Sequence, residues 1–533
     1  MTAGEHIIGF ELSAEGSDII TSINPATGDK VGDFFVAIIT EVDKAAEKAA
    51  AAFQIYRKKS GTEKAGFLEA IAEEIMAIGD ELISVCCAES ALPKGRIEGE
   101  RGRTIGQLKL FANLLKEGSW LDARIETADP ERVPLPKPDI RFMQIPLGPV
   151  AVFGASNFPL AFSVAGGDTV SALAAGCSVI VKAHPAHPAT SWLIGNAIQK
   201  AAITMEMPDG IFSLLFGDGP VLGTQLVKHP AIKAVGFTGS FGAGKAIYDI
   251  AVRRDIPIPV YAEMGSTNPV FILPQALQNQ ADLFVKGFSG SVTLGVGQFC
   301  TNPGMLIYEN TDDSEIFTNK LEEEFKQTSG GVMLAANIYK SYNAGVARHA
   351  DTAGVTTLAK GKYSENLNTA APVLFKIKSD TLKAHPNLAE EVFGPTSMLV
   401  EATSRQDVLE IARNLTGHLT ATVHGTDSDL LEYKDLLNIL EQKVGRLLIN
   451  GYPTGVEVCS AMVHGGPFPA TSDSRSTSVG TAAIDRFTRP VCYQDMPQAL
   501  LPDELKNTNP LGIWRLINGS LSNEAINYKP TIL

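Results

Sequence analysis

Four short, mostly apolar segments between Gly148 and Ser266 limit the fold of this chain more than any other feature. The segments cover residues 150–153, 178–182, 234–238 and 260–263. The first three are followed by stretches rich in small residues, at 161–175, 191–202 and 243–252. Apolar strands that alternate with helices are typical of a parallel sheet covered on both faces. The sequence therefore predicts a doubly wound α/β domain of the nucleotide-binding type, ending near Ser266.

Helical spacing of apolar residues appears on both sides of this domain. Before it, the spacing predicts helices at 41–56, 64–91 and 106–117. After it, a second α/β region is expected from about 267 to 469, with helices at 284–294, 313–327 and 405–415 and strands at 398–402 and 446–450.

Two segments are expected to lie outside these domains. The segment 129–138 contains four prolines and is expected to be an extended connection. The tail after Asp485 is rich in Pro and Asn and is expected to lie on another domain or a second subunit.

The net charge and the distribution of basic and apolar residues exclude several classes of protein. Lys and Arg number 45 against 59 Asp and Glu, a net charge of −14, and no basic run is present, so nucleic acid is not an expected partner. No basic start precedes an apolar stretch, and no window reaches about 18 apolar residues, so neither a secretory signal nor a membrane span is expected.

The number and spacing of the cysteines exclude two further kinds of structural site. Six cysteines in 533 residues, with no C-x-x-C pair, are too few for a disulfide scaffold and predict no metal site. A reduced, cytoplasmic protein is expected.

One motif partly matches a nucleoside triphosphate-binding loop. Residues 239–246 match the first seven positions of a P-loop, but Ala246 stands where a Ser or Thr hydroxyl binds Mg²⁺. What remains is a Gly-rich turn that opens a helix, whose N-terminus favours a pyrophosphate. A plain tight turn is the alternative interpretation.

Cys300 is the cysteine whose setting suits a nucleophile. It lies in Gly-Gln-Phe-Cys-Thr-Asn-Pro, a small and polar turn, whereas free cysteines are most often buried and inert. Asn157 and Glu263 follow apolar strands, where open α/β sheets bind ligands, although either residue alone is commonly just a cap. No histidine is directed towards Cys300 by the sequence, which argues against a papain-like protease.

Six motifs then occur in one order along the chain: Asn157 in N-F-P, Lys182 closing a strand, Gly239 and Ser240 in F-T-G-S, Glu263 in E-M-G-S, Cys300 in G-Q-F-C-T, and Glu391 and Phe393 in E-V-F-G-P. Together, over about residues 24–489, they resemble the NAD(P)-dependent aldehyde dehydrogenase superfamily. The resemblance implies an aldehyde dehydrogenase-like α/β fold: a Rossmann-type cofactor domain (1–126 and 148–266), an α/β catalytic domain (267–470) and a small oligomerisation element (127–147 and 485–533). It also implies a homodimer or homotetramer.

The resemblance assigns catalytic roles residue by residue. Cys300 would attack the aldehyde carbon, and the Asn157 amide with the Cys300 backbone N–H would hold the oxyanion. Glu263 would activate water to hydrolyse the thioester, which suits a carboxylate whose pKa burial has raised.

The resemblance also places NADP or NAD on the first domain. Lys182 would bind the adenosine ribose, Gly239 and Ser240 the pyrophosphate, and Glu391 the nicotinamide ribose, with Phe393 against the ring. Solvated surface positions are the alternative interpretation of Lys182 and Glu391.

Departures from the family pattern bear on which cofactor and which substrate are used. The run Lys182-Ala183-His184-Pro185 lacks the acid that often binds the ribose 2′-hydroxyl, so NADP is expected to be accepted, with His184 adding positive character. Ser266, where Gly is common, is expected to matter little.

Within the family, these departures, the runs at 181–191 and 261–271 and the long C-terminal tail most closely resemble α-ketoglutaric semialdehyde dehydrogenases. They also resemble NADP-dependent long-chain fatty aldehyde dehydrogenases. The former substrate carries a carboxylate, for which Arg103 is the proposed partner; a solvated helix face is the alternative role of that Arg. The expected substrate wall comprises Phe158, Phe162, Val164 and Phe468. CoA acylation and a non-catalytic structural role are less consistent with retention of Cys300, Asn157 and Glu263.

Overall fold

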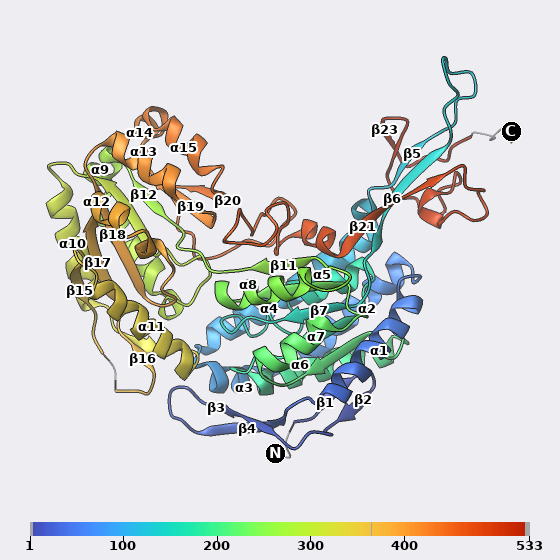
Figure 1. Ribbon diagram of the computed structural model, residues 1–533, viewed down its shortest axis with the longest axis horizontal. Coiled ribbons are helices and arrows are strands. Elements are labelled where there is room, and N and C mark those ends of the chain that lie inside the picture. The colour runs from blue at the N-terminus through green and yellow to red at the C-terminus, as the bar shows by residue number, and fades with distance from the viewer. Residues whose placement is uncertain (1–3, 364, 528–533) are drawn as a thin grey trace.

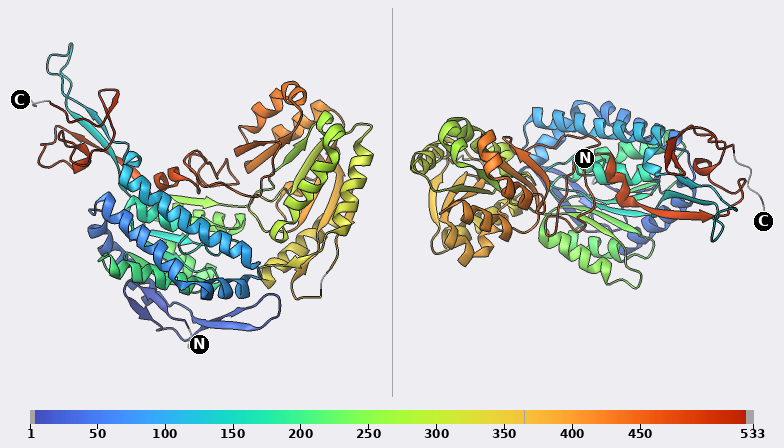
Figure 2. Two further views of the ribbon diagram at one scale, coloured as in Figure 1. Left: turned by 180° about the vertical axis from the view of Figure 1, so that it is seen from behind. Right: turned by 90° about the horizontal axis from the view of Figure 1, so that it is seen from above.

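Two seven-stranded sheets covered by helices form the two lobes seen in Figure 1, and a narrow arm extends from the first lobe. The structure is a computed structural model that describes residues 4–363 and 365–527. Seen from above, the arm and the second lobe lie at opposite ends of the long axis (Figure 2). No helix in this described part is both long and apolar enough to cross a membrane.

The first sheet has the strand order β11-β10-β7-β8-β9-β1-β2. The first five run parallel, as predicted: β11 (Val260–Glu263), β10 (Ala234–Thr238), β7 (Val150–Phe153), β8 (Val179–Lys182) and β9 (Phe212–Leu215). The amino-terminal strands β1 (His6–Ile8) and β2 (Glu11–Ser13) extend the edge antiparallel, which the sequence did not predict.

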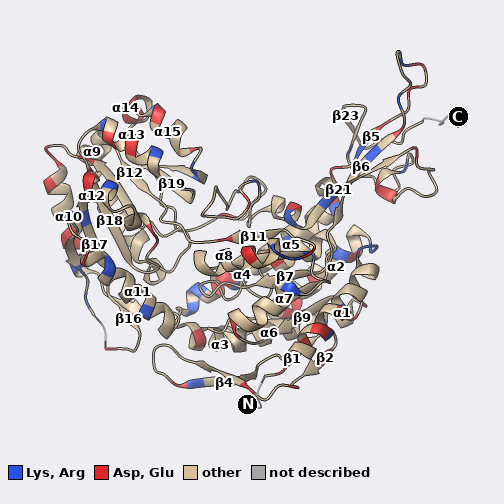
Figure 3. Ribbon diagram, in the orientation of Figure 1, with Lys and Arg blue, Asp and Glu red and all other residues tan. Residues whose placement is uncertain are grey.

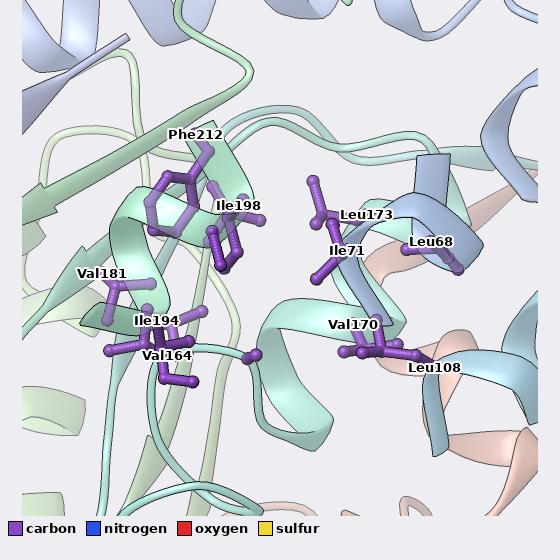
Figure 4. Packing of buried hydrophobic residues seen from close by; sticks show 14 of the residues in the cluster. Leu68, Ile71, Leu108, Val164, Val170, Leu173, Val181, Ile194, Ile198 and Phe212 are labelled. Atoms are coloured by element: carbon purple, nitrogen blue, oxygen red, sulfur yellow. The ribbon is translucent and has the colours of Figure 1, made fainter. Parts of the chain in front are cut away.

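Alternate residues of the central strands enter two different cores, which shows that helices cover both faces of the sheet. Val179 and Val181 pack with Ile194 and Ile198 in one cluster (Figure 4), whereas Ile180 belongs to the cluster on the other face. The first face carries α2 (Gly61–Ile78), α3 (Asp80–Ser90), α4 (Lys94–Glu117), α5 (Gly167–Ala175) and α6 (Pro188–Thr204). The second carries α1 (Ile39–Tyr56), α7 (Thr224–Lys228) and α8 (Phe241–Val252).

Several predicted helices differ in extent from the observed ones. Helices α4 and α9 (Pro274–Thr293) begin earlier than predicted, at Lys94 and Pro274 rather than at 106 and 284. The region 64–91 forms two helices because Gly79 has a positive φ of 69°, which ends α2 and starts α3. Helix α5 begins only at Gly167, because residues 161–166 form a turn in which the Gly166 N–H donates to Ser163.

The second lobe repeats the parallel design, with the order β15-β17-β18-β13-β12-β19-β20 and only β15 antiparallel. Its strands are β15 (Thr356–Lys360), β17 (Val373–Lys378), β18 (Thr396–Ala402), β13 (Met305–Glu309), β12 (Val270–Ile272), β19 (His418–His424) and β20 (Val444–Ile449). The helices packed on it include α9 (Pro274–Thr293), α10 (Ser314–Gln327), α11 (Ala336–Ala350), α12 (Ser379–Ala384), α13 (Arg405–Asn414), α14 (Asp427–Glu432) and α15 (Lys434–Leu440).

The arm is a five-stranded sheet of order β21-β6-β5-β22-β23. It joins β5 (Arg124–Glu126) and β6 (Ile140–Pro146) to three strands of the tail, β21 (Thr488–Gln494), β22 (Arg515–Ile517) and β23 (Ser520–Ser522). The Pro-rich segment 129–138 is the loop between β5 and β6, closed by a bridge from Asp129 to Lys137. The tail therefore lies on another part of the same chain, and β5 belongs to the arm rather than to the first domain. A separate hairpin of β3 (Ile19–Ile23) and β4 (Lys30–Phe35) packs beneath the first lobe.

Candidate active site

A cleft of about 930 Å³ opens where the two lobes meet, at the carboxyl ends of β7, β10 and β11. The chain leaves β7 on one side towards β8 and returns on the other side as β10, so the cleft lies at the point where strand order reverses. Most of the residues proposed for chemistry and cofactor binding line it: Asn157, His184, Gly239, Ser240, Glu263, Cys300, Glu391 and Phe393.

Cys300 is carried into the cleft by a turn that only glycine permits. Gly297 has a φ of 64°, and a Cβ there would lie 2.3 Å from the carbonyl carbon of Gly394. The close approach brings the Cys300 turn against the segment that carries Glu391 and Phe393.

His464 is the functional neighbour that sequence reasoning missed. Its Nε2 lies 3.4 Å from the Cys300 Sγ and 2.9 Å from Glu263 Oε1, and the side chain is fully buried. The sequence did not direct any histidine towards Cys300, and the structure places His464 there. The only available signal was the Gly- and Pro-rich setting of residues 463–469 after the last strand of the second sheet.

Glu263 lies at the end of β11, buried and hydrogen-bonded by the Ser478 hydroxyl. Burial alone would raise the pKa of Glu263, but His464 and the Ser478 hydroxyl lower it below its usual value overall. The net shift is therefore opposite to the raised pKa on which the base role was argued, because two polar partners outweigh burial.

For the Cys300 thiol, the surroundings raise the pKa rather than lower it. Burial raises the pKa of Cys300 well above its usual range, and the charges of Glu263 and Glu391 add to that effect, while Arg103 opposes it. A thiolate here therefore needs a proton acceptor or a cation, and His464 is in contact to supply either.

Two donors lie where an oxyanion on the attacked carbon could be held. The Asn157 amide donates one N–H to the Gln298 carbonyl at 3.0 Å and has a second to offer. The Cys300 backbone N–H donates to no partner in the described part of the chain.

Asn268 ties the two catalytic segments together, a role the sequence did not suggest. Its side-chain amide donates to the carbonyls of Ser266, Cys300 and Asn302 at 3.0, 2.8 and 2.9 Å. Its φ of 46° is one that Asn tolerates better than most residues. Ser266 also contributes, because its hydroxyl donates to the Asn268 side-chain oxygen and accepts from the Leu419 N–H.

The residues proposed for the adenosine end of a dinucleotide lie at the end of β8 and just after it, and of these His184 lines the cleft whereas Lys182 does not. Burial lowers the pKa of Lys182 to about 8, partly opposed by Asp218. Burial, with His187 and Lys182 nearby, lowers the pKa of His184 well below its usual value. His184 is therefore neutral, which corrects the expectation of positive character. Since its Nδ1 accepts the Ala186 N–H, its Nε2–H is the available donor. Pro185 is exposed and does not line the cleft.

The remaining proposed cofactor residues frame the rest of the cleft. Ser240 caps α8, its hydroxyl accepting the Ala243 N–H at 3.4 Å. Burial raises the pKa of Glu391 to about 7, although the Ser266 backbone N–H lowers it in part. A Cβ at Gly265 would lie 2.1 Å from Glu391 Oε2, so a larger residue there would displace the Glu391 carboxylate. The cleft therefore fits a dinucleotide, with a helix N-terminus at one end and the thiol at the other.

The residues proposed for the substrate wall separate into three groups. Phe158 and Phe162 form a cluster with Phe299, with ring centroids 5.2 and 5.5 Å from Phe158. Val164 instead packs in the first-lobe core beside Val181 and Ile194 (Figure 4), so its assignment to the wall was wrong.

Phe468 and Arg103 occupy different parts of the site. Phe468 is half exposed and lies edge-on to Phe241 of α8, with ring centroids 5.9 Å apart. Arg103 stacks on Phe162, with its Cζ 5.3 Å from the ring centroid, and donates to the Val456 carbonyl at 3.1 Å.

Glu263, Cys300 and His464 also form a possible metal-ligand set. Each offers a ligand atom within 4.8 Å of the others. Carboxylate, thiolate and imidazole are ligands that zinc accepts.

Known proteins are similar to this chain in sequence and in fold. The aldehyde dehydrogenase family model matches residues 12–488. The chain is 49% identical over 518 residues to alpha-ketoglutaric semialdehyde dehydrogenase 2 of Azospirillum brasilense, covering 97% of this chain and 99% of that protein. It is 47% identical over 521 residues to alpha-ketoglutaric semialdehyde dehydrogenase of Acinetobacter baylyi, with the same coverage. In fold, it is similar to 1-pyrroline-5-carboxylate dehydrogenase from Thermus with bound NAD, with a TM-score of 0.77, 21% identity and 92% of each chain covered.

Proposed function

Because this chain belongs to the aldehyde dehydrogenase family, we propose that it oxidises α-ketoglutaric semialdehyde to α-ketoglutarate. Membership makes it an oxidoreductase that acts on an aldehyde with NAD(P). The two relatives above support the substrate, since they are similar to nearly the whole chain. The observation that carries the chemistry is the contact of His464 with both Cys300 and Glu263.

The first step is addition of the thiol to the aldehyde. His464 takes the proton as Cys300 Sγ bonds to the carbonyl carbon, which becomes a thiohemiacetal. The Asn157 amide and the Cys300 N–H then stabilise the oxygen, and one such donor is typically worth about 2.7–4 kcal/mol of barrier. When bound, NAD(P) would supply the acceptor for the hydride that the thiohemiacetal carbon then loses, and that loss would leave a thioester on Cys300.

Hydrolysis then releases the acid. Glu263 accepts a proton from water as the water oxygen bonds to the thioester carbonyl carbon, and the C–S bond breaks to return Cys300. The hydrogen bond from Ser478 keeps Glu263 ionised and therefore able to act as a base.

A second substrate class has a specific observation in its favour. The wall of Phe158, Phe162 and Phe299 is apolar and suits a fatty aldehyde chain. Steady-state kinetics with NADP and NAD would decide, comparing α-ketoglutaric semialdehyde with hexanal and dodecanal on one preparation. We expect kcat/KM to be highest for the semialdehyde; a higher value for dodecanal would overturn the substrate assignment.

A non-catalytic role makes a different prediction. Iodoacetamide should inactivate the protein by alkylating Cys300, and substrate with cofactor should protect it. Absence of any turnover, with Cys300 unreactive, would favour a structural role.

Assembly and compartment are also proposals. The arm exposes the apolar side chains of Val133, Leu135, Leu500, Trp514 and Leu521, which supports a homodimer or homotetramer formed through it. Sedimentation of the purified protein tests this, with a monomer as the contrary result. All six cysteines are free, and a thiol nucleophile must stay reduced, which supports a cytoplasmic location.

A further inference from the structure

Two arginines near the thiol, Arg103 and Arg446, carry charge that the described part of the chain does not pair. Arg103 lies on α4 of the first lobe and Arg446 on β20 of the second. Neither forms an ion pair with an acidic side chain among residues 4–363 and 365–527. Arg96, by contrast, pairs with the buried Glu100 at 3.2 Å.

Both guanidinium groups are held in place by one loop. Arg103 Nη1 donates to the Val456 carbonyl, while Arg446 Nη1 and Nη2 donate to the carbonyls of Gly455 and Pro453. Both side chains are therefore fixed in place from opposite lobes by residues 453–456.

Each guanidinium still has buried donors without a partner. Arg103 Nε and Nη2 and Arg446 Nε are shielded from solvent and donate to nothing in the described structure. A buried donor without an acceptor destabilises the folded protein, and a charged donor does so more than a neutral one. Such a cost is understandable where a ligand supplies the missing acceptors.

Both groups also lie within electrostatic range of Cys300 without bonding to it. Each attracts the Cys300 thiolate, and Arg103 also interacts with Glu100 and Glu263. An ω-aldehyde acid of five carbons places its carboxylate four bonds from the reacting carbon, a reach of roughly 5 Å. Arg103 stacks on Phe162, and the Phe162 ring centroid lies 6.2 Å from that of His464, which contacts the Cys300 thiol. The loop at 453–456 joins Arg446 to Arg103, so both guanidinium groups lie on the side of the thiol where such a carboxylate would be held.

We propose that Arg103 and Arg446 together form the binding site for the substrate's carboxylate, and that this pair selects short aldehydes with an anionic end. The inference rests on the proposed function and adds Arg446 to it. Because acidic and basic residues are interspersed over both lobes (Figure 3), a net charge of −14 does not favour anions, and local cations must do so.

The test separates recognition of charge from support of the loop. Arg446→Gln and Arg103→Gln remove the charge, Arg446→Lys keeps it, and Arg101→Gln is the matched control, since Arg101 lies on the same helix and donates to the Gly79 carbonyl. Kinetics would use α-ketoglutaric semialdehyde, succinic semialdehyde and neutral pentanal.

We expect each Gln variant to raise KM for the two anionic aldehydes by about 10- to 100-fold, the range lost with a charged hydrogen bond. KM for pentanal should change less than about threefold, and Arg446→Lys should recover part of the loss. Inhibition by α-ketoglutarate should weaken in parallel.

Equal losses for all three aldehydes would overturn the proposal and leave the arginines as supports of the loop. No loss for any aldehyde would also overturn it. If instead the unmodified protein prefers pentanal to both anionic aldehydes, the proposed function itself fails, and that result is visible before any variant is made.

Discussion

The imidazole of His464 lies against the thiol of Cys300, with Nε2 3.4 Å from Sγ. The same nitrogen is 2.9 Å from Glu263 Oε1, so one side chain contacts both the nucleophile and the hydrolytic base. The thiol needs this neighbour, because burial and nearby carboxylates raise its pKa.

Replacing His464 should make Cys300 less reactive. In His464→Asn the thiol loses its contact with the imidazole and keeps Glu263, whose negative charge opposes thiolate formation. Its alkylation by iodoacetamide at pH 7.5 should therefore slow by about tenfold or more, one pKa unit being a tenfold change in thiolate. The pH–rate profile for alkylation, followed by mass spectrometry, checks this. His229→Asn, a change on the far side of the first lobe, is the control, and an unchanged profile in His464→Asn would contradict the role.

Glu263→Gln should separate oxidation from hydrolysis. Because Gln cannot accept a proton from water, the first turnover should release about one NAD(P)H per active site and the steady-state rate should then fall by about 10²- to 10⁴-fold. Stopped-flow absorbance at the reduced-cofactor band measures both phases. A full steady-state rate would assign hydrolysis to another base, with His464 the nearest.

Asn157→Ala should slow the first chemical step. Loss of one oxyanion donor typically costs about a hundred- to a thousand-fold in rate. Single-turnover kinetics should show the loss in the burst rate, while cofactor affinity, measured by fluorescence titration, stays the same. A slower steady state with a normal burst would place Asn157 outside the first step.

The preference between cofactors should depend on pH through Lys182. Its pKa is lowered to about 8, so the charged form that attracts a 2′-phosphate is present below that pH and is lost above it. The ratio of kcat/KM for NADP to that for NAD should be at least comparable to one at pH 7 and should fall between pH 8 and 9. Lys182→Met should flatten the dependence; a strong preference for NAD at pH 7 would contradict the role.

Zinc should inhibit the protein reversibly. Glu263, Cys300 and His464 offer three ligand atoms within 4.8 Å of one another, a set that matches a zinc site with one open position. Micromolar Zn²⁺ should lower the rate and a chelator should restore it. His464→Asn should weaken the inhibition relative to His229→Asn, whereas equal sensitivity of the two variants would exclude the site.

Local sequence patterns predicted the strands and helices of the fold well. They predicted the side-chain contacts between distant segments less well. The parallel strands β7, β8, β10 and β11 follow from their apolar composition, and the sheet edge then places Asn157 and Glu263 together. His464 was missed because it acts through a contact between the lobes, with Glu263 of the first and Cys300 of the second. Asn268 was missed because its partners Cys300 and Asn302 lie 32 and 34 residues away in the sequence. Arg446 was missed because its buried, unpartnered Nε shows only in the folded chain. Val164 was misplaced because its neighbours Phe158 and Phe162 suggested a wall, yet the turn at residues 161–166 directs it into the core.

The contact of Asn157 with Gln298 has a consequence for how the protein loses activity. Glu263 ends a strand of the first sheet, whereas Cys300 precedes a strand of the second, and a few side-chain contacts across the boundary, such as Asn157 with Gln298 and Glu263 with His464, hold them in register. Low concentrations of urea that disrupt these contacts between the lobes would abolish catalysis while both sheets remain folded. The enzymatic rate would then report a change in the packing between the lobes at urea concentrations that leave the circular dichroism spectrum unchanged. Substitutions at the boundary would lower the rate as catalytic substitutions do, although they touch no reacting atom.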